Sequence, residues 1–180
     1  MKKSILIPFI ALAVMALALF GVSRGLSDVA EDNAEKELLQ TMQTLLPGST
    51  EFTEKAYKGE NANIRRVFKG NGGFVIETAT QGYADEIVML VGVSNDGTVT
   101  GLTVRDMHET VGLGANALTD WEFLAQFLKT DGSAEVGTDV DAISGATVTS
   151  RAIARCVKSA VGYVTGEDSD ADSGATSWGG

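Results

Sequence analysis

An uninterrupted apolar segment near the start of the chain limits how the protein can be organised. The 18 residues from Ile5 to Val22 carry no charged side chain. A helix of this length rises roughly 27 Å, close to the hydrocarbon thickness of a bilayer. We therefore expect residues 1–24 to form a retained membrane anchor. The alternative is a cleaved signal peptide, because Ala16-Leu17-Ala18 resembles a cleavage site, although this triplet lies inside the apolar run.

The charges beside this segment predict its orientation. Lys2 and Lys3 precede it, and no acidic residue occurs before Asp28. Positive flanks stay in the cytoplasm. We expect a single-pass protein of the cytoplasmic (inner) membrane, with its N-terminus inside and everything after residue 24 on the extracytoplasmic (periplasmic) side.

The remaining chain has the pattern of an α+β domain with antiparallel β-hairpins and packed helices. The expected parts are a linking amphipathic helix within 25–48, one domain at 49–165 and an acidic disordered tail at 166–180. Expected strands cover 64–68, 74–76, 87–93 and 99–104, with a turn at Asn95-Asp96-Gly97. Expected helices cover 28–46, 118–128 (apolar at Trp121, Phe123, Leu124, Phe127 and Leu128) and 149–164.

Composition excludes several classes of function. The chain has one Cys, one His and a net charge of −10. A Cys-rich metal site, a disulfide framework and a His-Glu-x-x-His zinc site are therefore impossible, and the acidity argues against a nucleic-acid partner. Cys156 falls on the apolar face of the last helix, where we expect a buried core residue. Ser144 lacks the Gly-x-Ser-x-Gly pattern of a hydrolase nucleophile. We expect neither a metal site nor a catalytic side chain.

Two loops remain as candidates for binding. Gly112-Leu113-Gly114-Ala115-Asn116-Ala117 matches Gly-x-Gly-x-x-Ala but follows hairpins, so we interpret it as a tight loop that lets the backbone approach a flat or anionic group. Residues 141–150 form a small-residue loop that opens into a helix, with hydroxyls at Ser144, Thr147, Thr149 and Ser150. These hydroxyls and the free N–H groups of the helix start would converge on an anion such as a phosphate. Simple N-capping by Ser or Thr explains the same residues equally well.

Both loops carry a resemblance to a known family. Asp141-Ala142-Ile143-Ser144-Gly145-Ala146-Thr147 resembles the flavinylation motif of the FMN-binding domain family. His108-Glu109-Thr110-Val111-Gly112-Leu113-Gly114 resembles a second hallmark, His-Glu-Thr-Pro-Gly-Leu-Gly, with Val111 in place of proline. The likeness runs in order from residue 5 to about 165. The family includes the G subunits of Rnf-type ion-translocating complexes and the C subunits of Na⁺-translocating NADH:quinone oxidoreductases.

The resemblance implies a covalent flavin. FMN would be joined through its phosphate to the Thr147 hydroxyl by a flavin transferase outside the cytoplasmic membrane. The recognition loop would comprise Asp141, Ser144, Gly145 and Ala146, and Thr149 would also contact the cofactor. The flavin pocket would be lined by His108, Glu109, Thr110, Gly112, Leu113 and Gly114. For His108 the alternative is a turn residue that bonds its own loop.

The resemblance also implies a function. The protein would be an electron-relay subunit of a membrane-bound ferredoxin/NAD complex of Rnf type, with further membrane subunits as partners and no self-sufficient catalysis. The length of 180 residues favours a G subunit over the generally longer C subunit. A stand-alone extracytoplasmic electron carrier and a scaffold without flavin would both be compatible with the same fold. The tail repeats the motif at 170–176, either by chance or as a second flavin site at Thr176.

Overall fold

The computed structural model describes Met15, residues 32–107 and residues 119–167. Apart from Met15, the predicted anchor at 1–24 lies outside the described residues, as do the loop at 108–114 and the tail motif at 170–176. Within the described ranges, no helix has both the length and the apolar character needed to cross a membrane. The chain divides into two compact units, Met1–Gln40 and Thr41–Gly180, and the second contains the sheet and the candidate site.

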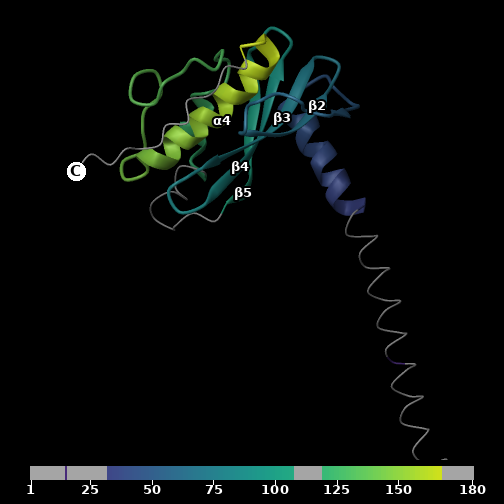
Figure 1. Ribbon diagram of the computed structural model, residues 1–180, viewed down its shortest axis with the longest axis horizontal. Coiled ribbons are helices and arrows are strands. Elements are labelled where there is room, and N and C mark those ends of the chain that lie inside the picture. The colour runs from purple at the N-terminus through teal and green to yellow at the C-terminus, as the bar shows by residue number, and fades with distance from the viewer. Residues whose placement is uncertain (1–14, 16–31, 108–118, 168–180) are drawn as a thin grey trace, which may run out of the picture. The chain divides into compact units, whose positions relative to one another are not determined.

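A five-stranded antiparallel sheet forms the centre of the second unit, with strand order β1-β2-β3-β4-β5 (Figure 1). The strands are β1 (Thr53–Lys55), β2 (Ile64–Lys69), β3 (Gly73–Gln81), β4 (Glu86–Ser94) and β5 (Val99–Met107). The predicted hairpins are confirmed, and so is the α+β class. The central strands are apolar because both faces of the sheet are covered. Consecutive side chains of β3 and β4 point to opposite faces, and most of them are buried.

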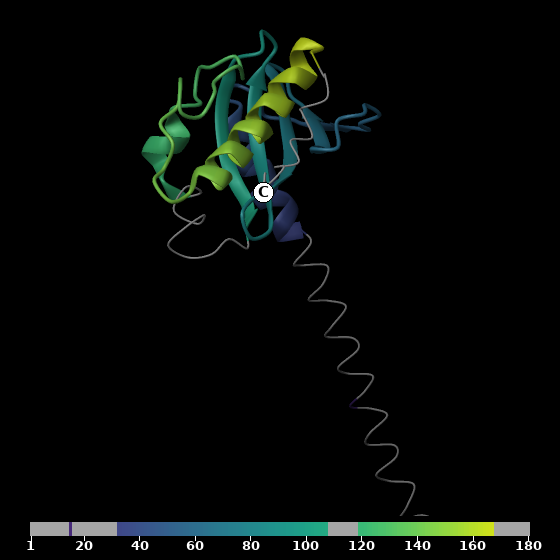
Figure 2. The ribbon, with the colours of Figure 1, turned by 60° about the vertical axis from the view of Figure 1, so that its left-hand side comes forward.

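Helix α4 (Thr147–Thr165) covers one face of the sheet and packs against β3 and β4. Figures 1 and 2 both show it lying over the sheet, and in Figure 2 it crosses the strands obliquely. It buries Ile153, Cys156, Val157 and Val161 against the sheet. Each aliphatic side chain buried in this way stabilises the domain by about 1.5–3 kcal/mol. The predicted helix at 149–164 is confirmed, and it begins two residues earlier than expected.

The end of a second helix, at residues 32–45, covers the other face. Gly92 of β4 and Gly101 of β5 are paired opposite each other. A residue next to each of them along its strand faces α4, so a side chain at either glycine would point to the other face of the sheet. Leu45 packs directly on this glycine pair, since a Cβ on Gly92 would lie 2.3 Å from the Leu45 carbonyl oxygen. That oxygen accepts a hydrogen bond of 2.6 Å from Thr100 Oγ1. The predicted stop at Pro47-Gly48 is confirmed.

Helix α3 (Trp121–Ala125) is shorter than the predicted 118–128. Asp120 caps it by accepting a hydrogen bond of 3.0 Å from the Phe123 N–H. Tight turns then carry the chain to Lys129, whose φ is 64°. The apolar pattern therefore continues through turns rather than through one helix. Trp121, expected on the apolar face, is 66% exposed because it lies at the first position of this short helix.

Candidate cofactor-attachment site

A tight turn brings the chain into α4. The N–H of Ala146 donates a 2.9 Å hydrogen bond to the Ile143 carbonyl, and Gly145 between them has a φ of 81°. This combination is typical of a type II turn, whose third residue requires a positive φ that glycine adopts without strain. Ala146 is buried in the main core. The turn is therefore anchored from inside, while Ser144 and Gly145 remain exposed.

Thr147 is the first residue of α4, and its side chain is exposed. The N-cap is Ala146, and no side chain caps the helix. The first i→i−4 hydrogen bond of the helix runs from the Ser150 N–H to the Ala146 carbonyl, at 2.9 Å. The N–H groups of residues 147–149 thus have no carbonyl partner one turn before them. The N-capping interpretation of these hydroxyls is wrong, because none of them serves as a cap.

Burial divides the four hydroxyls of this segment. Ser144 and Thr147 are exposed, whereas Thr149 and Ser150 are fully buried. The expectation that all four converge on one surface is wrong, because Thr149 and Ser150 share the buried face of α4 with Ile153. Neither buried oxygen has a hydrogen-bond partner among the described residues. Leaving a buried hydroxyl without a hydrogen-bond partner costs about 1–3 kcal/mol, so both side chains are energetically unfavourable where they lie, next to Thr147.

Two hydrogen bonds tie the site to its neighbours. The Asp141 N–H donates to Gln126 Oε1 at 2.9 Å, and Gln126 is the C-cap of α3. On the third turn of α4, Arg155 Nη2 donates a hydrogen bond of 3.0 Å to the carbonyl of Gln81, at the end of β3. The loop before α4 is thus fixed to α3, and the middle of α4 is fixed to the β3–β4 hairpin. Asp141 holds its place through its backbone, and its side chain is exposed.

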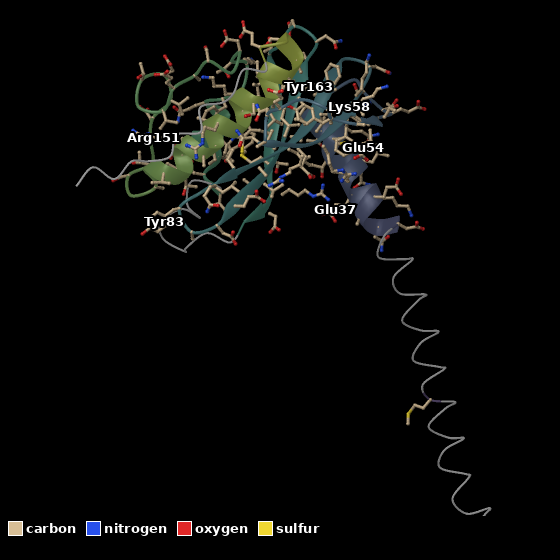
Figure 3. The ribbon with its side chains drawn as sticks, in the orientation of Figure 1. Glu37, Glu54, Lys58, Tyr83, Arg151 and Tyr163 are labelled. Carbon is tan, nitrogen blue, oxygen red and sulfur yellow. The ribbon has the colours of Figure 1, made fainter. Side chains whose placement is uncertain are left out.

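The electrostatics of the helix start favour an anion. The first turn of α4 contains no acidic residue. Arg151 lies one turn after Thr147, is exposed, and forms no ion pair among the described residues (Figure 3). The positive end of the helix dipole and the guanidinium of Arg151, four residues on, would both attract an anion placed at Thr147. The sequence interpretation missed Arg151 and Gln126, although the four-residue spacing of Arg151 from Thr147 was a visible signal.

Cys156 is a core residue, as predicted. Its side chain is buried, and its sulfur lies 3.2 Å from Thr80 Oγ1, which also hydrogen-bonds the Ala152 carbonyl at 3.0 Å. Burial raises the pKa of the Cys156 thiol. The thiol therefore stays protonated at neutral pH and packs as a small apolar group.

The chain is similar to known proteins over the part that contains this site. The FMN-binding domain matches residues 82–162, which include the turn, Thr147 and most of α4. The G subunit of the ion-translocating oxidoreductase complex of Methanosarcina acetivorans is 31% identical over 184 residues, covering 91% of this chain and 95% of that protein. The predicted pocket residues between His108 and Gly114 lie within the matched range but outside the described residues.

Two further proteins are similar over part of the chain. The G subunit of the Na(+)-translocating ferredoxin:NAD(+) oxidoreductase complex of Acetobacterium woodii is 38% identical over 97 residues. The match covers 47% of each protein, so the chain spans about half the length of this relative. The crystal structure of Shewanella oneidensis NqrC aligns with a TM-score of 0.46 and 25% identity, covering 71% of this chain and 70% of that one.

Proposed function

The chain belongs to the family of G subunits of ion-translocating oxidoreductase complexes, and we propose that it is an electron relay carrying FMN on Thr147. The observation that carries this proposal is the exposed Thr147 hydroxyl at the uncapped start of a 19-residue helix. FMN, when bound, supplies one-electron chemistry, and the protein supplies position and electrostatics. The relay therefore needs no catalytic side chain of its own.

The described residues fit a phosphate on Thr147. A phosphodiester formed at Thr147 Oγ1 would carry a negative charge beside the three N–H groups that have no helical acceptor. Arg151 would contribute a charged donor from the next turn. The turn at Ile143–Ala146 holds Thr147 in position, because Ala146, the residue before it, is packed in the core. The Thr149 side chain is fully buried, so only the backbone N–H of this residue would face the phosphate.

A covalent bond suits the proposed location. Residues 1–24 would anchor the chain with the N-terminus in the cytoplasm and the FMN domain outside, where a flavin transferase would load it. A dissociable flavin facing bulk solvent would be lost by dilution, whereas a phosphoester cannot dissociate. The proposed partners are the membrane subunits of an Rnf-type complex that connects ferredoxin and NAD to ion transport.

Three competing assignments make different predictions about FMN and copurification. A C subunit of a Na⁺-translocating NADH:quinone oxidoreductase would copurify with subunits of that complex instead. A stand-alone flavinylated carrier would carry FMN and copurify with no membrane subunit. A scaffold module would carry no FMN at all.

The test is flavin fluorescence of the full chain on a denaturing gel, after export from cells that contain an active flavin transferase. We expect the wild type and Thr176→Ala to fluoresce and Thr147→Ala to be dark. Thr147→Ser keeps a hydroxyl at the same helix position and should restore a band. Fluorescence that persists in Thr147→Ala and disappears when Thr176 is also changed would move the cofactor to the tail. A dark wild type beside a labelled control substrate would support the scaffold.

A further inference from the structure

The outward face of α4 carries a row of positive charges. The helix contains Arg151, Arg155 and Lys158 and no acidic residue, although the chain has a net charge of −10. Arg151 and Lys158 are exposed, and Arg155 is half-buried. The i, i+4 and i, i+3 spacings place the three on one side of the helix. Figure 3 marks Arg151 near the start of α4 and Tyr163 near its end, so the row follows much of the helix.

No ion pair among the described residues neutralises this row. The ion pairs in this part of the chain use Arg65, Arg66 and Arg105 instead. Arg155 donates a hydrogen bond to the neutral Gln81 carbonyl, which leaves its charge uncompensated. Like charges at these helical spacings also repel one another. The row therefore attracts an anionic occupant.

The segment that follows α4 is acidic. Asp168, Asp170 and Asp172 alternate along it, and no basic residue follows Lys158. In an extended chain, alternate residues share one side, so three carboxylates can face the same surface. The helix ends at Gly166, whose φ of 77° turns the chain away from the helix axis. The acidic tail at 166–180 thus begins with a change of direction.

The distances along the helix and the tail agree. Lys158 lies about 12 Å before Gly166 along α4, and Arg155 lies about 16 Å before it. An extended chain covers about 3.3 Å per residue, so Asp170 reaches about 13 Å from Gly166 and Asp172 about 20 Å. A tail that runs back along α4 therefore brings Asp170 to Lys158 and Asp172 to Arg155.

We propose that the acidic tail binds to Arg155 and Lys158 of its own chain and screens the start of α4. A tethered segment acts at a high effective concentration, which favours it over an acidic partner chain. Residues 173–176 repeat the Ser-Gly-Ala-Thr of the attachment loop. They extend to about 33 Å from Gly166 and so reach Thr147, about 28 Å away. Arg151 remains available to a phosphate on Thr147. The screening rests on the proposed attachment at Thr147, whereas the binding of the tail does not.

The first test is zero-length cross-linking of the full chain in detergent, purified from cells without a flavin transferase. A carbodiimide joins a carboxyl group to the Lys158 amine as an amide and takes up the released water to become a urea. Peptide mass mapping measures the yield of Lys158 joined to residues 168–172. Arg155→Gln should lower this yield severalfold, and so should high salt. Asp172→Asn should lower the yield of the link between Lys158 and Asp170.

A matched control distinguishes binding from mere closeness in sequence. Lys55→Gln removes an exposed base of β1 and should leave the yield unchanged. An unchanged yield in Arg155→Gln, with near-UV circular dichroism like that of the wild type, would overturn the proposal. Links that join light and heavy chains in an isotope mixture would assign the row to the tail of a second copy, which would also overturn it.

The second test is the rate of FMN attachment at Thr147, followed by peptide mapping with limiting transferase in a Thr176→Ala background. Asp168→Asn/Asp172→Asn removes two charges, keeps the fixed letters of the tail motif and should raise the rate severalfold. Glu51→Gln/Glu60→Gln removes two exposed acids elsewhere and should not. Equal rates in the two variants would overturn the screening. Absence of FMN at Thr147 in every variant would overturn the proposed function, and the binding of the tail would then be decided by the cross-link alone.

Discussion

Replacement of Gly92 by alanine should push the end of the helix at residues 32–45 away from the sheet. A Cβ at Gly92 would lie 2.3 Å from the carbonyl oxygen of Leu45 and 2.9 Å from its carbonyl carbon. Both atoms are backbone, so no side-chain rotation relieves the overlap. The hydrogen bond from Thr100 Oγ1 holds this carbonyl in place. The helix end must therefore move away from the sheet.

The size of the effect follows from what the movement exposes. Met42, Leu45 and Leu46 are 5%, 5% and 2% exposed, and full exposure of each would cost about 1.5–3 kcal/mol. Complete detachment would thus cost roughly 4.5–9 kcal/mol, whereas local overpacking costs about 1–3 kcal/mol. Because a small shift relieves most of the overlap, we expect Gly92→Ala to lower the free energy of unfolding by about 2–4 kcal/mol.

Urea unfolding of the full chain in detergent, followed by near-UV circular dichroism, measures this loss as a shift of midpoint at unchanged slope. Gly72→Ala is the matched control, since its Cβ would meet only Ser49 Oγ at 3.9 Å. It should change stability by less than about 1 kcal/mol. Equal stability of the two variants would refute the packing of Leu45 on the glycine pair.

Three further predictions concern the region of the site. Gly145→Ala places a Cβ at a φ of 81°; a strain of about 1–2 kcal/mol should slow flavin labelling in a time course with limiting transferase. Arg151→Gln should also slow labelling, and Arg151→Lys should retain most of the rate, since the positive charge remains. Burial raises the pKa of Cys156, so iodoacetamide should label it slowly at pH 8.5 in the native protein and rapidly in urea. Above that pH the unfolded thiol loses its proton while the native one keeps it, so the free energy of unfolding should fall with pH in the wild type and not in Cys156→Ala.

The hairpins could be predicted because apolar residues are concentrated in the strands from β2 to β5, and the turn at Asn95-Asp96-Gly97 interrupts them clearly. Strand β1 could not, since all three of its residues, Thr53–Lys55, are exposed. It is held by pairing with β2 and by the 2.9 Å ion pair between Glu54 and Arg66. Such a strand depends on its neighbour and has no apolar pattern of its own.

The proposed attachment motif could be identified from the amino-acid sequence, but which of its hydroxyls are exposed could not be predicted. The same hydroxyl chemistry occurs at Thr147 and Thr149, and only the rotation of α4 determines that the first is exposed and the second buried. Trp121 was misplaced for a related reason. Its spacing fits an apolar stripe, and the stripe ends because α3 covers only Trp121–Ala125.

The rotation of α4 also gives a physical reason why Thr147, rather than a neighbouring hydroxyl, would receive the flavin. A phosphoryl group on Thr149 or Ser150 would require opening the contact between α4 and the sheet, because both side chains are fully buried. Ser144 is exposed but lies in the turn before the helix, away from the N–H groups without helical acceptors. Thr147 alone among these four hydroxyls combines exposure with a position at the positive end of α4. A flavin added there would leave the core undisturbed, so we infer that a transferase acting on this loop would meet one suitable hydroxyl and not four.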